Sequence, residues 1–262
     1  MISFDLDFFP LAEARGEELG QFDECLESFL GCLRRNGNII GDHVTLELAD
    51  RVQARVLALA PDALDEANLS EYARKDGEQV RALSARDPQT RRVEEKTSEQ
   101  TWCDCQAPSF RLLYSQWSRL ISPVLCGDCW RDVPLYRLPL IGDSQSKEHG
   151  ELTTWLDTRE NFEWIWLGSG AGEREAYRQL ARPRSPFIKA TRELAARLEA
   201  KTGVPTFTFL KHYYRKWDKH CPLCERKWKW KGPEELRFRC EHCRLISEKA
   251  TDYRTPLLQL HC

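Results

Sequence analysis

The N-terminal part of the chain alternates between strand-like and helix-like hydrophobic patterns. Residues 2–9 alternate apolar and polar side chains, which predicts a strand. Residues 17–35 repeat apolar side chains at close to 3.6 residues and end at an Asn-Gly pair, which predicts an amphipathic helix. Two alternating runs within 43–60 predict a pair of strands, and 66–85 has a weaker helical pattern. A small α+β unit is therefore expected.

The pattern changes after this unit. Residues 86–101 are dense in charge and almost without apolar side chains, which is typical of a linker or exposed loop. Short strand-like runs follow at 110–114 and 134–140. Residues 147–202 are mostly helical, with breaks at a Gly-Ser-Gly-Ala-Gly loop and at two prolines. Residues 206–210, Thr-Phe-Thr-Phe-Leu, predict one more strand.

Length and composition describe a globular protein. The chain has 262 residues, of which 41% are hydrophobic, and a formal net charge of −2. The sequence has no run of about 18 uncharged apolar residues, as a membrane-spanning helix would need. Its N-terminal segment has acidic residues where a secretory signal peptide would have basic ones. We expect a cytoplasmic protein with no membrane contact. In that compartment the eleven cysteines are kept reduced, so paired cysteines indicate metal before disulfide.

Charge is unevenly distributed. Residues 1–102 hold 12 basic and 21 acidic side chains, whereas 211–249 hold 12 basic and 6 acidic ones. An acidic front and a basic tail suggest two partners, or a tail that pairs with its own front.

Two CxxC pairs near the C-terminus give the sharpest signal. Cys221-Pro-Leu-Cys224 and Cys240-Glu-His-Cys243 are separated by fifteen residues, the spacing of a four-thiolate zinc ribbon. Each CxxC turn points two sulfurs the same way, and two turns complete a tetrahedron around zinc. The alternating runs 227–231 and 236–239 predict the hairpin between them. Two unrelated pairs of buried thiols are the alternative.

A second cluster has a similar layout. Cys103-Asp-Cys105 is followed, twenty residues later, by Cys126-Gly-Asp-Cys129. We expect a second zinc here, although CxC is tighter than the usual knuckle. A redox-active dithiol at CGDC is the alternative, but the βαβ context of that motif is missing. In both clusters four thiolates leave zinc no open position, so the metal would stabilise the fold without activating a substrate.

Other candidates for chemistry are weaker. Asp5-Leu-Asp7 has the DxD pattern of phosphotransfer enzymes but lacks a long buried strand ahead of it, so we expect an edge strand with outward carboxylates. The glycine-rich loop 168–172 lacks the strand and Lys-Ser/Thr of a phosphate-binding loop. Cys25 and Cys32 share the apolar face of a helix and are expected in the core. No catalytic residues are predicted.

The basic tail interleaves cations with aromatic side chains at 211–217 and 227–231. Such a surface can neutralise phosphates and stack unpaired bases. The alternative is an ordinary ribbon in which tryptophan packs on the knuckles and lysine faces water. The overall negative charge argues against a dedicated nucleic-acid-binding protein.

The segments CPLCERKW…FRCEHCRLIS, GVPTFTFL and CGDCWRDVPLYRLP resemble an uncharacterised bacterial family described as zinc-ribbon-containing and possibly nucleic-acid-binding. The resemblance covers roughly residues 102–250. It implies that the ribbon ligands are Cys221, Cys224, Cys240 and Cys243, and that Cys126 and Cys129 form a central knuckle. Glu225 departs from the pattern, because many ribbons have glycine after the second cysteine. The chain also resembles immunity proteins of secreted nuclease toxins, including those of type VI systems.

These observations predict an α+β fold with a small N-terminal α+β unit, a central zinc-knuckle region, a helical hairpin-like middle and a C-terminal zinc ribbon. The expected domains are an N-terminal α+β domain at 1–85, a charged linker or loop at 86–101, a central CxC/CxxC knuckle plus helical region at 102–210, and the ribbon at 211–262. We expect one or two zinc ions, held by Cys221, Cys224, Cys240 and Cys243 and by Cys103, Cys105, Cys126 and Cys129.

The expected function is non-enzymatic. An acidic, metal-stabilised protein suits binding to a protein partner, and the resemblance implies an immunity-type inhibitor of a basic nuclease toxin. A zinc-ribbon nucleic-acid-binding protein is the alternative, with weak, salt-sensitive binding through the tail. A redox- or zinc-responsive switch at the Cys103–Cys129 cluster is a third hypothesis.

Overall fold

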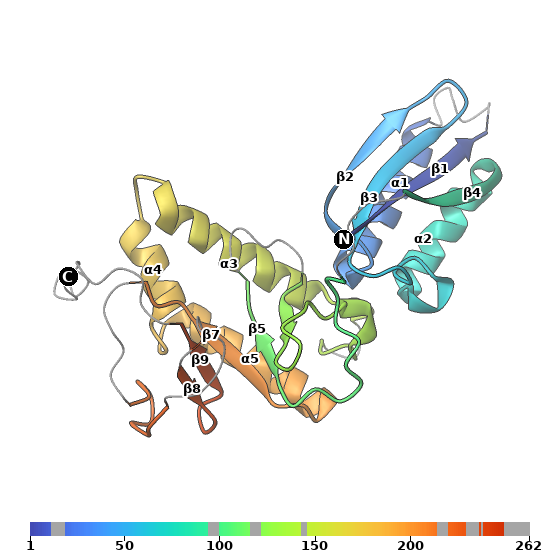
Figure 1. Cartoon of the computed structure of the whole chain (residues 1–262). Helices are drawn as coiled ribbons and strands as arrows, with labels where there is room; N and C mark the ends of the chain where they lie inside the picture. Colours follow the sequence, from blue (N-terminus) through green and yellow to red (C-terminus); the bar gives the residue numbers. More distant parts are fainter. Residues whose placement is uncertain are drawn as a thin grey trace. The chain divides into compact units, whose positions relative to one another are not determined.

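A computed structural model describes residues 1–11, 19–93, 100–115, 122–142, 146–213, 220–228, 236 and 238–248 (Figure 1). The chain divides into two compact units. The first comprises Met1–Asp104, Leu120–Ser122 and Arg131–Thr153, and the second comprises Cys105–Arg119, Pro123–Trp130 and Thr154–Cys262. Of the helices in the described part of the chain, none combines the length and apolar character needed to span a bilayer.

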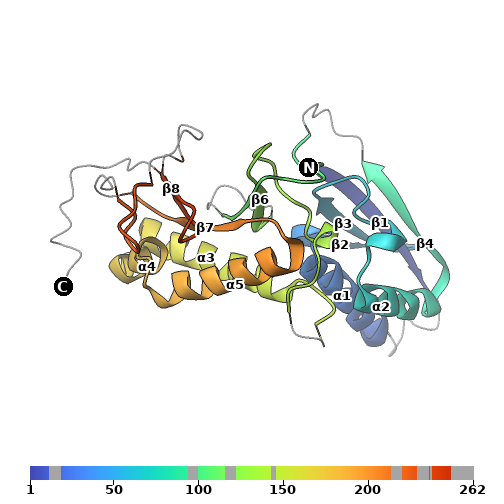
Figure 2. The ribbon, with the colours of Figure 1, turned by 90° about the horizontal axis from the view of Figure 1, so that it is seen from below.

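The first unit is a four-stranded antiparallel sheet with two helices. Its elements are β1 (Ile2–Pro10), α1 (Leu19–Asn36), β2 (Ile40–Glu47), β3 (Val52–Ala58), the short 3₁₀ helix η2 (Glu66–Asn68), α2 (Glu71–Ala82) and β4 (Ser84–Val93). The sheet order is β2-β3-β1-β4. This βαββαβ arrangement is the ferredoxin-like architecture, and the predicted α+β unit is confirmed. Figure 2 shows α1 and α2 together on one side of the sheet.

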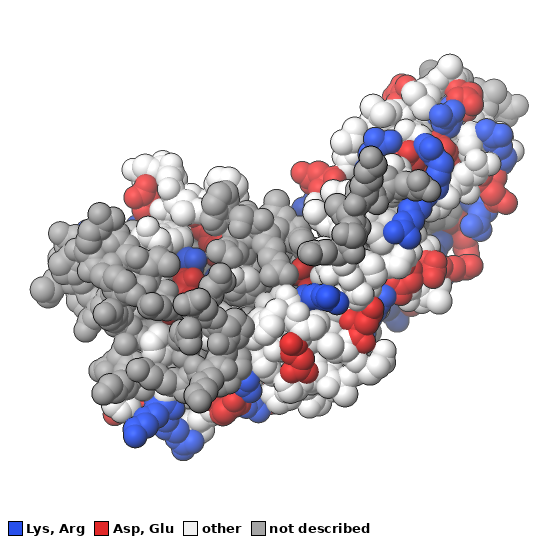
Figure 3. All heavy atoms as spheres, in the orientation of Figure 1, with Lys and Arg blue, Asp and Glu red and all other residues white. Residues whose placement is uncertain are grey.

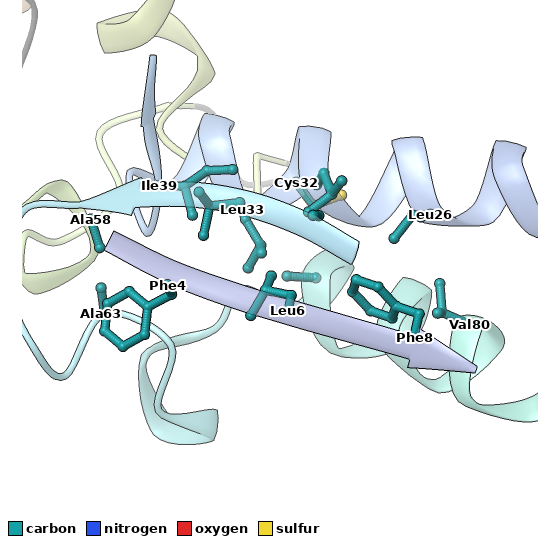
Figure 4. Packing of buried hydrophobic residues seen from close by; sticks show 14 of the residues in the cluster. Phe4, Leu6, Phe8, Leu26, Cys32, Leu33, Ile39, Ala58, Ala63 and Val80 are labelled. Atoms are coloured by element: carbon teal, nitrogen blue, oxygen red, sulfur yellow. The ribbon is translucent and has the colours of Figure 1, made fainter. Parts of the chain in front are cut away.

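The core of the first unit lies between the sheet and the helices. Alternate side chains of β1, such as Phe4 and Phe8, are buried on the helix side, where they meet Leu26 and Leu33 of α1 and Val80 of α2 (Figure 4). The period-2 pattern of β1 and the period-3.6 pattern of α1 each place one apolar face in this core, as the sequence predicts. The opposite face of β1 is also largely buried. Burial of each such side chain stabilises the fold by about 1.5–3 kcal/mol.

Two predictions about this unit are wrong. Residues 86–93, expected as part of a linker, belong to β4, which pairs with β1 along most of its length. β1 is consequently an inner strand rather than an edge strand. The charged residues of β4 conceal the strand from pattern analysis because an edge strand buries little of its own surface.

The second unit contains a five-stranded sheet and three helices. Its elements are β5 (Arg111–Leu113), β6 (Val124–Cys126), α3 (Gly150–Gly168, whose first turn belongs to the first unit), α4 (Glu173–Ala181), α5 (Pro186–Thr202), β7 (Thr206–Leu210), β8 (Phe238–Cys240) and β9 (Leu245–Ser247). The helices lie on one side of the sheet (Figure 2). The helices predicted within 147–202 and the strands at 110–114 and 206–210 are confirmed. The run 134–140 is not a strand, because Leu135–Arg137 forms the 3₁₀ helix η3.

Local signals fix the ends of α5. Ser185 caps its N-terminus by accepting a hydrogen bond from the backbone N–H of Ile188, and Pro186 occupies the first turn. Gly203 ends the helix in the left-handed region, with φ 67°. β7 starts three residues later and is buried throughout.

The sheet of the second unit joins both cysteine-bearing regions. Its order is β6-β5-β7-β9-β8. β5 and β9 both pair in parallel with β7, while β6 and β8 pair antiparallel at the two edges. β8 and β9 come from the ribbon and β5 and β6 from the central region, so the boundary predicted at residue 211 does not separate two sheets.

Candidate metal centres

The sulfurs of Cys221, Cys224, Cys240 and Cys243, here called the ribbon cluster, all lie within 4.8 Å of one another. The Sγ atoms of Cys224 and Cys240, from different CxxC pairs, are 3.5 Å apart. Sulfurs at the corners of a zinc tetrahedron with 2.3 Å bonds lie about 3.8 Å apart. Three of the four side chains are buried and Cys224 is half-buried. The structure thus brings together all four residues predicted from the ribbon spacing.

Cys103, Cys105, Cys126 and Cys129, here called the central cluster, also have their sulfurs within 4.8 Å of one another. Cys103 and Cys126 are buried, Cys129 is half-buried and Cys105 is exposed. The tighter CxC pair therefore reaches the same sulfur arrangement as a CxxC pair. This cluster is the more accessible of the two.

Each CxxC turn is followed by a residue with positive φ. Trp130, Glu225 and Arg244 have φ of 57°, 59° and 52°, and they are the three non-glycine residues with positive φ in the described part of the chain. The N–H of Trp130 donates to the C=O of Cys126 at 3.1 Å, and that of Glu225 to Cys221 at 2.9 Å. The left-handed residue turns the chain back after the second cysteine. Glu225 adopts the conformation that glycine has in many ribbons, so its departure from the family pattern leaves the turn in place.

The knuckles are attached to the edges of one sheet. Cys126 is the last residue of β6, and Cys240 is the last residue of β8. The turn 241–244 then leads into β9. Hydrogen-bonded strands therefore hold one cysteine of the Cys126–Cys129 knuckle and one of the Cys240–Cys243 knuckle in place.

Gly127 of the central knuckle is required by close packing. A Cβ at this position would lie 2.3 Å from the ring of Phe110. The N–H of Gly127 donates to the C=O of Phe110 at 2.9 Å. The next residue, Asp128, accepts hydrogen bonds from the backbone N–H of Ser109, at 2.7 Å, and from its hydroxyl. These contacts hold the CGDC turn against Ser109 and Phe110, the segment that leads into β5.

Arg137 anchors the CxC segment within the first unit. Its guanidinium donates to the C=O of Cys103 at 3.3 Å and pairs with Asp104 at 2.9 Å and Asp62 at 2.7 Å. Tyr136 donates to the same Asp62 carboxylate at 2.7 Å. Nothing in the spacing of Arg137 and Tyr136 along the sequence marks them as supports of the cysteine segment, so neither is predicted from the sequence.

The thiols of the ribbon cluster differ in acidity. Burial raises the pKa of Cys240 to about 11 and raises that of Cys243 as well. At Cys224 burial acts in the same direction, but hydrogen bonds from the backbone of Arg226 and from the other thiols outweigh it and lower the pKa to about 7. Zinc binds thiolate, so Cys224 offers a ligand in the required form near neutral pH.

Both clusters fit a zinc ion by donor chemistry and by sulfur spacing. Four thiolates form the usual donor set of a structural zinc site, and sulfur ligands exclude hard cations such as Mg²⁺ and Ca²⁺. When bound, zinc would supply a cross-link between chain segments. Because the donors already fill a tetrahedron, neither cluster leaves a coordination position for substrate or water.

The other sequence candidates have structural roles. Cys32 is buried in the core of the first unit, and burial raises the pKa of its thiol to about 12, so it is unreactive at neutral pH. Cys25 packs against the same core. The loop 168–172 connects α3 to α4, with Gly170 and Gly172 at positive φ. It is a helix–helix connection, as expected.

Asp5 of the DxD pair is buried under arginines. It lies on the sheet face opposite the helices, where Arg55 of β3 approaches at 2.7 Å and Arg91 of β4 at 2.7 Å. The hydrogen bond from Arg55 lowers the pKa of Asp5, against the effect of burial. In Figure 3 basic side chains are interspersed with acidic ones over this sheet. Asp5 is therefore an ion-pair partner, not the outward carboxylate we expected.

Several side chains of the basic tail are used for packing. Trp228 is 1% exposed and lies 5.2 Å from Phe238 between ring centroids. Lys211 is buried, pairs with Glu248 at 3.3 Å and lies over the ring of Trp166. These side chains fit the ordinary-ribbon interpretation rather than a base-stacking surface. Residues 214–219 and 229–231, including Arg215 and Trp217, lie outside the described residues.

Two family models match this chain. Residues 105–211 match a domain of unknown function (DUF2310), and residues 214–253 match a second domain of unknown function (DUF8594). The second match spans the whole ribbon cluster. Neither description names a zinc ribbon or an immunity protein. Two uncharacterized proteins of Haemophilus influenzae are 26% identical over 240 residues (84% of this chain, 88% of the relative) and 24% identical over 169 residues (61% and 78%).

Three solved structures resemble 37% of the chain, each with a TM-score of 0.29. They are Rv0793 from Mycobacterium tuberculosis (17% identity, 96% of that chain), an antibiotic biosynthesis monooxygenase (13%, 100%) and SnoaB, a cofactor-independent oxygenase from Streptomyces nogalater (15%, 94%). A likeness at this score supports no conclusion about activity. The chain is thus similar to two domain families whose descriptions name no function.

Proposed function

We propose that this chain is a non-enzymatic zinc-binding protein that acts by binding a protein partner, specifically as an immunity-type inhibitor of a basic nuclease toxin. The observation that supports a non-enzymatic zinc-binding protein is that each cluster brings four cysteine sulfurs together, enough to fill the coordination sphere of a zinc ion. Zinc held by four thiolates stabilises a fold and does not activate water. Rigid zinc modules therefore favour recognition over catalysis.

The acidic surface of α1 supports the choice of a basic partner. Asp23, Glu24 and Glu27 are exposed. Burial raises the pKa of Asp23, and the neighbouring carboxylates of Glu47 and Glu27 add to this effect. Nucleases bind polyanions, so their substrate-binding face is usually basic. Opposite charge on an inhibitor increases the association rate with such a face.

Zinc content is the first experiment. Protein purified without chelator should contain two zinc ions per chain by elemental analysis. Cys240→Ser should remove one and Cys126→Ser the other, whereas Cys25→Ser, outside both clusters, should remove none. Less than one zinc per chain in the unaltered protein would contradict the metal assignment. Equal zinc content in Cys126→Ser and Cys25→Ser would contradict the central site alone.

The partner is tested next. The immobilised chain captures proteins from source cells, and each captured protein is purified and assayed for nuclease activity with and without the chain. Stoichiometric inhibition of a basic nuclease is expected. Glu24→Lys with Glu27→Lys should slow association and weaken its salt dependence, while Glu193→Lys, an exposed charge reversal on α5, should change neither. Captured partners without nuclease activity, or nucleases that the chain does not inhibit, would contradict the proposal.

A further inference from the structure

The first unit contains a cavity of about 220 Å³ on the helix side of its sheet. Leu6 and Phe8 of β1, Phe29 of α1 and Val80 of α2 form its apolar walls. Figure 4 shows Leu6, Phe8 and Val80 on this side of the sheet. Polar side chains of α2 and β4, among them Arg74, Glu78 and Thr90, complete the lining. The cavity is thus apolar inside and polar at its margin.

Two local features of the backbone make room for it. The β1–β4 ladder shifts register between Asp7 and Phe9, so that β4 has two residues, Asp87 and Pro88, where β1 has one. Such a bulge bends the strand away from its regular path, and bulges occur often beside binding sites. Pro88 itself lines the cavity and, without an N–H, cannot restore the ladder.

On the opposite wall, α2 has a glycine where a larger residue would intrude. A Cβ on Gly77 would lie 3.2 Å from the ring of Phe29. Glycine costs an interior helical position about 0.5–1 kcal/mol relative to alanine. Glycine at position 77 leaves room for the ring of Phe29 in the cavity wall despite this cost. A bulge on β4 and a glycine on α2 thus both line the cavity.

We propose that this cavity is a binding site for a small, uncharged, largely apolar molecule with one or two fused rings and one hydrogen-bonding group. A 150 Å³ apolar cavity holds benzene, so 220 Å³ corresponds by proportion to about nine heavy atoms. The volume lies below the 300–1,000 Å³ of most drug-sized ligand pockets. A bicyclic molecule the size of indole fits this range.

The charges at the margin select against an ionic ligand. Arg74 and Arg81 line the cavity together with Glu66 and Glu78, so cations and anions are balanced. Arg81 is further neutralised by Asp87 at 3.2 Å. A charged ligand would meet as much repulsion as attraction there. Thr90 pairs with Leu6 of the cavity wall, and its hydroxyl instead offers a neutral hydrogen bond to one polar group.

The site is separate from the cysteine clusters, so it does not rest on the proposed function. The test uses the full, zinc-loaded chain and 5-fluoroindole, followed by fluorine NMR. Saturable one-site binding is expected. Ala73→Leu fills the cavity from α2, where Ala73 is 0% exposed and part of the lining, and should weaken binding at least tenfold. Ala82→Leu, the same change at an exposed position of the same helix outside the lining, should leave affinity unchanged.

A second filling variant covers the case in which Ala73→Leu fails to fold. Thr90→Leu narrows the cavity from the edge strand and should also weaken binding at least tenfold, with thermal unfolding as the check on the fold. The absence of saturable binding by the unaltered chain would overturn the proposal. Unaltered affinity in a folded filling variant would do the same, because the probe would then be bound elsewhere.

Discussion

The guanidinium of Arg244 holds the carboxylate of Glu199 at two points, with Nη2–Oε1 2.9 Å and Nε–Oε2 3.0 Å. Arg244 is the left-handed residue that follows Cys243, and Glu199 lies near the end of α5. The same carboxylate accepts a hydrogen bond from the backbone N–H of Thr206, the first residue of β7, at 3.0 Å. One carboxylate thus links the second ribbon knuckle, a helix and the central strand of the sheet.

Replacing Glu199 with alanine should destabilise the second unit by about 1 kcal/mol, because both partners are partly exposed and solvent screens the pair. Urea unfolding of the zinc-loaded protein measures this. Glu193→Ala is the control, since it removes a carboxylate from an exposed position of the same helix. An equal loss of stability in both variants would show that the link to β7 has no energetic role.

A glycine at position 225 should tighten the ribbon knuckle. The left-handed conformation costs a non-glycine residue roughly 1–2 kcal/mol, and glycine removes this cost. Part of the resulting stabilisation is lost, because glycine has more conformational freedom in the unfolded chain. Glu225→Gly should therefore slow the transfer of zinc from the ribbon cluster to a competing chelator by about two- to fivefold. Glu225→Ala removes the same carboxylate but keeps the backbone cost. If alanine and glycine behave alike, the effect belongs to charge and not to φ.

The sequence predicts the metal ligands better than it predicts the residues that hold the cysteine segments in place. Cysteine spacing is diagnostic because a knuckle is built from consecutive residues, so Cys221–Cys224 and Cys240–Cys243 identify themselves. The same spacing argument pairs Cys103 and Cys105 with Cys126 and Cys129. The supports come from distant parts of the chain. Arg137 reaches the C=O of Cys103 across 34 positions, and no local pattern encodes that contact.

The errors have a common cause. The charged composition of residues 86–93 predicts a linker, yet these charges contact the sheet: Arg91 pairs with buried Asp5, and Arg86 lies 3.5 Å over the ring of Phe9. For the basic tail, the burial of Trp228 and Lys211 fits the ordinary-ribbon alternative. Composition alone does not show which charged or aromatic side chains face water. The position after the second cysteine, which the sequence singles out at Glu225, is left-handed in all three CxxC pairs.

Gly127→Ala should disrupt the central knuckle. The added Cβ would lie 2.3 Å from the Phe110 ring, which is itself packed edge-on against Trp130 and Phe207. Neither the ring nor the knuckle can move without breaking these contacts, and such overpacking costs about 1–3 kcal/mol. Thermal unfolding and zinc content should both decrease.

Two further variants make this result specific. Gly20→Ala places the same methyl group on α1, where nothing lies within 4 Å, and should not reduce stability. Shortening the obstructing ring in Gly127→Ala with Phe110→Leu should restore part of the lost zinc. If the double variant binds no more zinc than Gly127→Ala alone, the clash with Phe110 is not the cause.

His149 should make the first unit sensitive to mild acid. The side chain is 2% exposed, and its Nδ1 atom has no hydrogen-bond partner among the described residues. Burial lowers the pKa of His149 to about 4, and a hydrogen bond to the backbone of Leu138 offsets this only in part. The unfolded chain has a histidine pKa of about 6.5. Above that value the imidazole is neutral in both states, and its contribution to stability is fully present.

As the pH falls from about 6.5 toward 4, His149 becomes protonated in the unfolded chain but stays neutral in the folded chain. The free energy of unfolding therefore decreases. The total loss from this one group is about 3 kcal/mol, or up to about 1.4 kcal/mol per pH unit. Urea unfolding of the first unit at pH 7.5, 6 and 5 measures the slope. His149→Gln should be less stable at pH 7.5 but lose much less on acidification. Zinc release at low pH affects the unaltered protein and His149→Gln alike, so it cancels when their free energies of unfolding are subtracted. If stability depends on pH equally in the two proteins, His149 takes up its proton without unfolding.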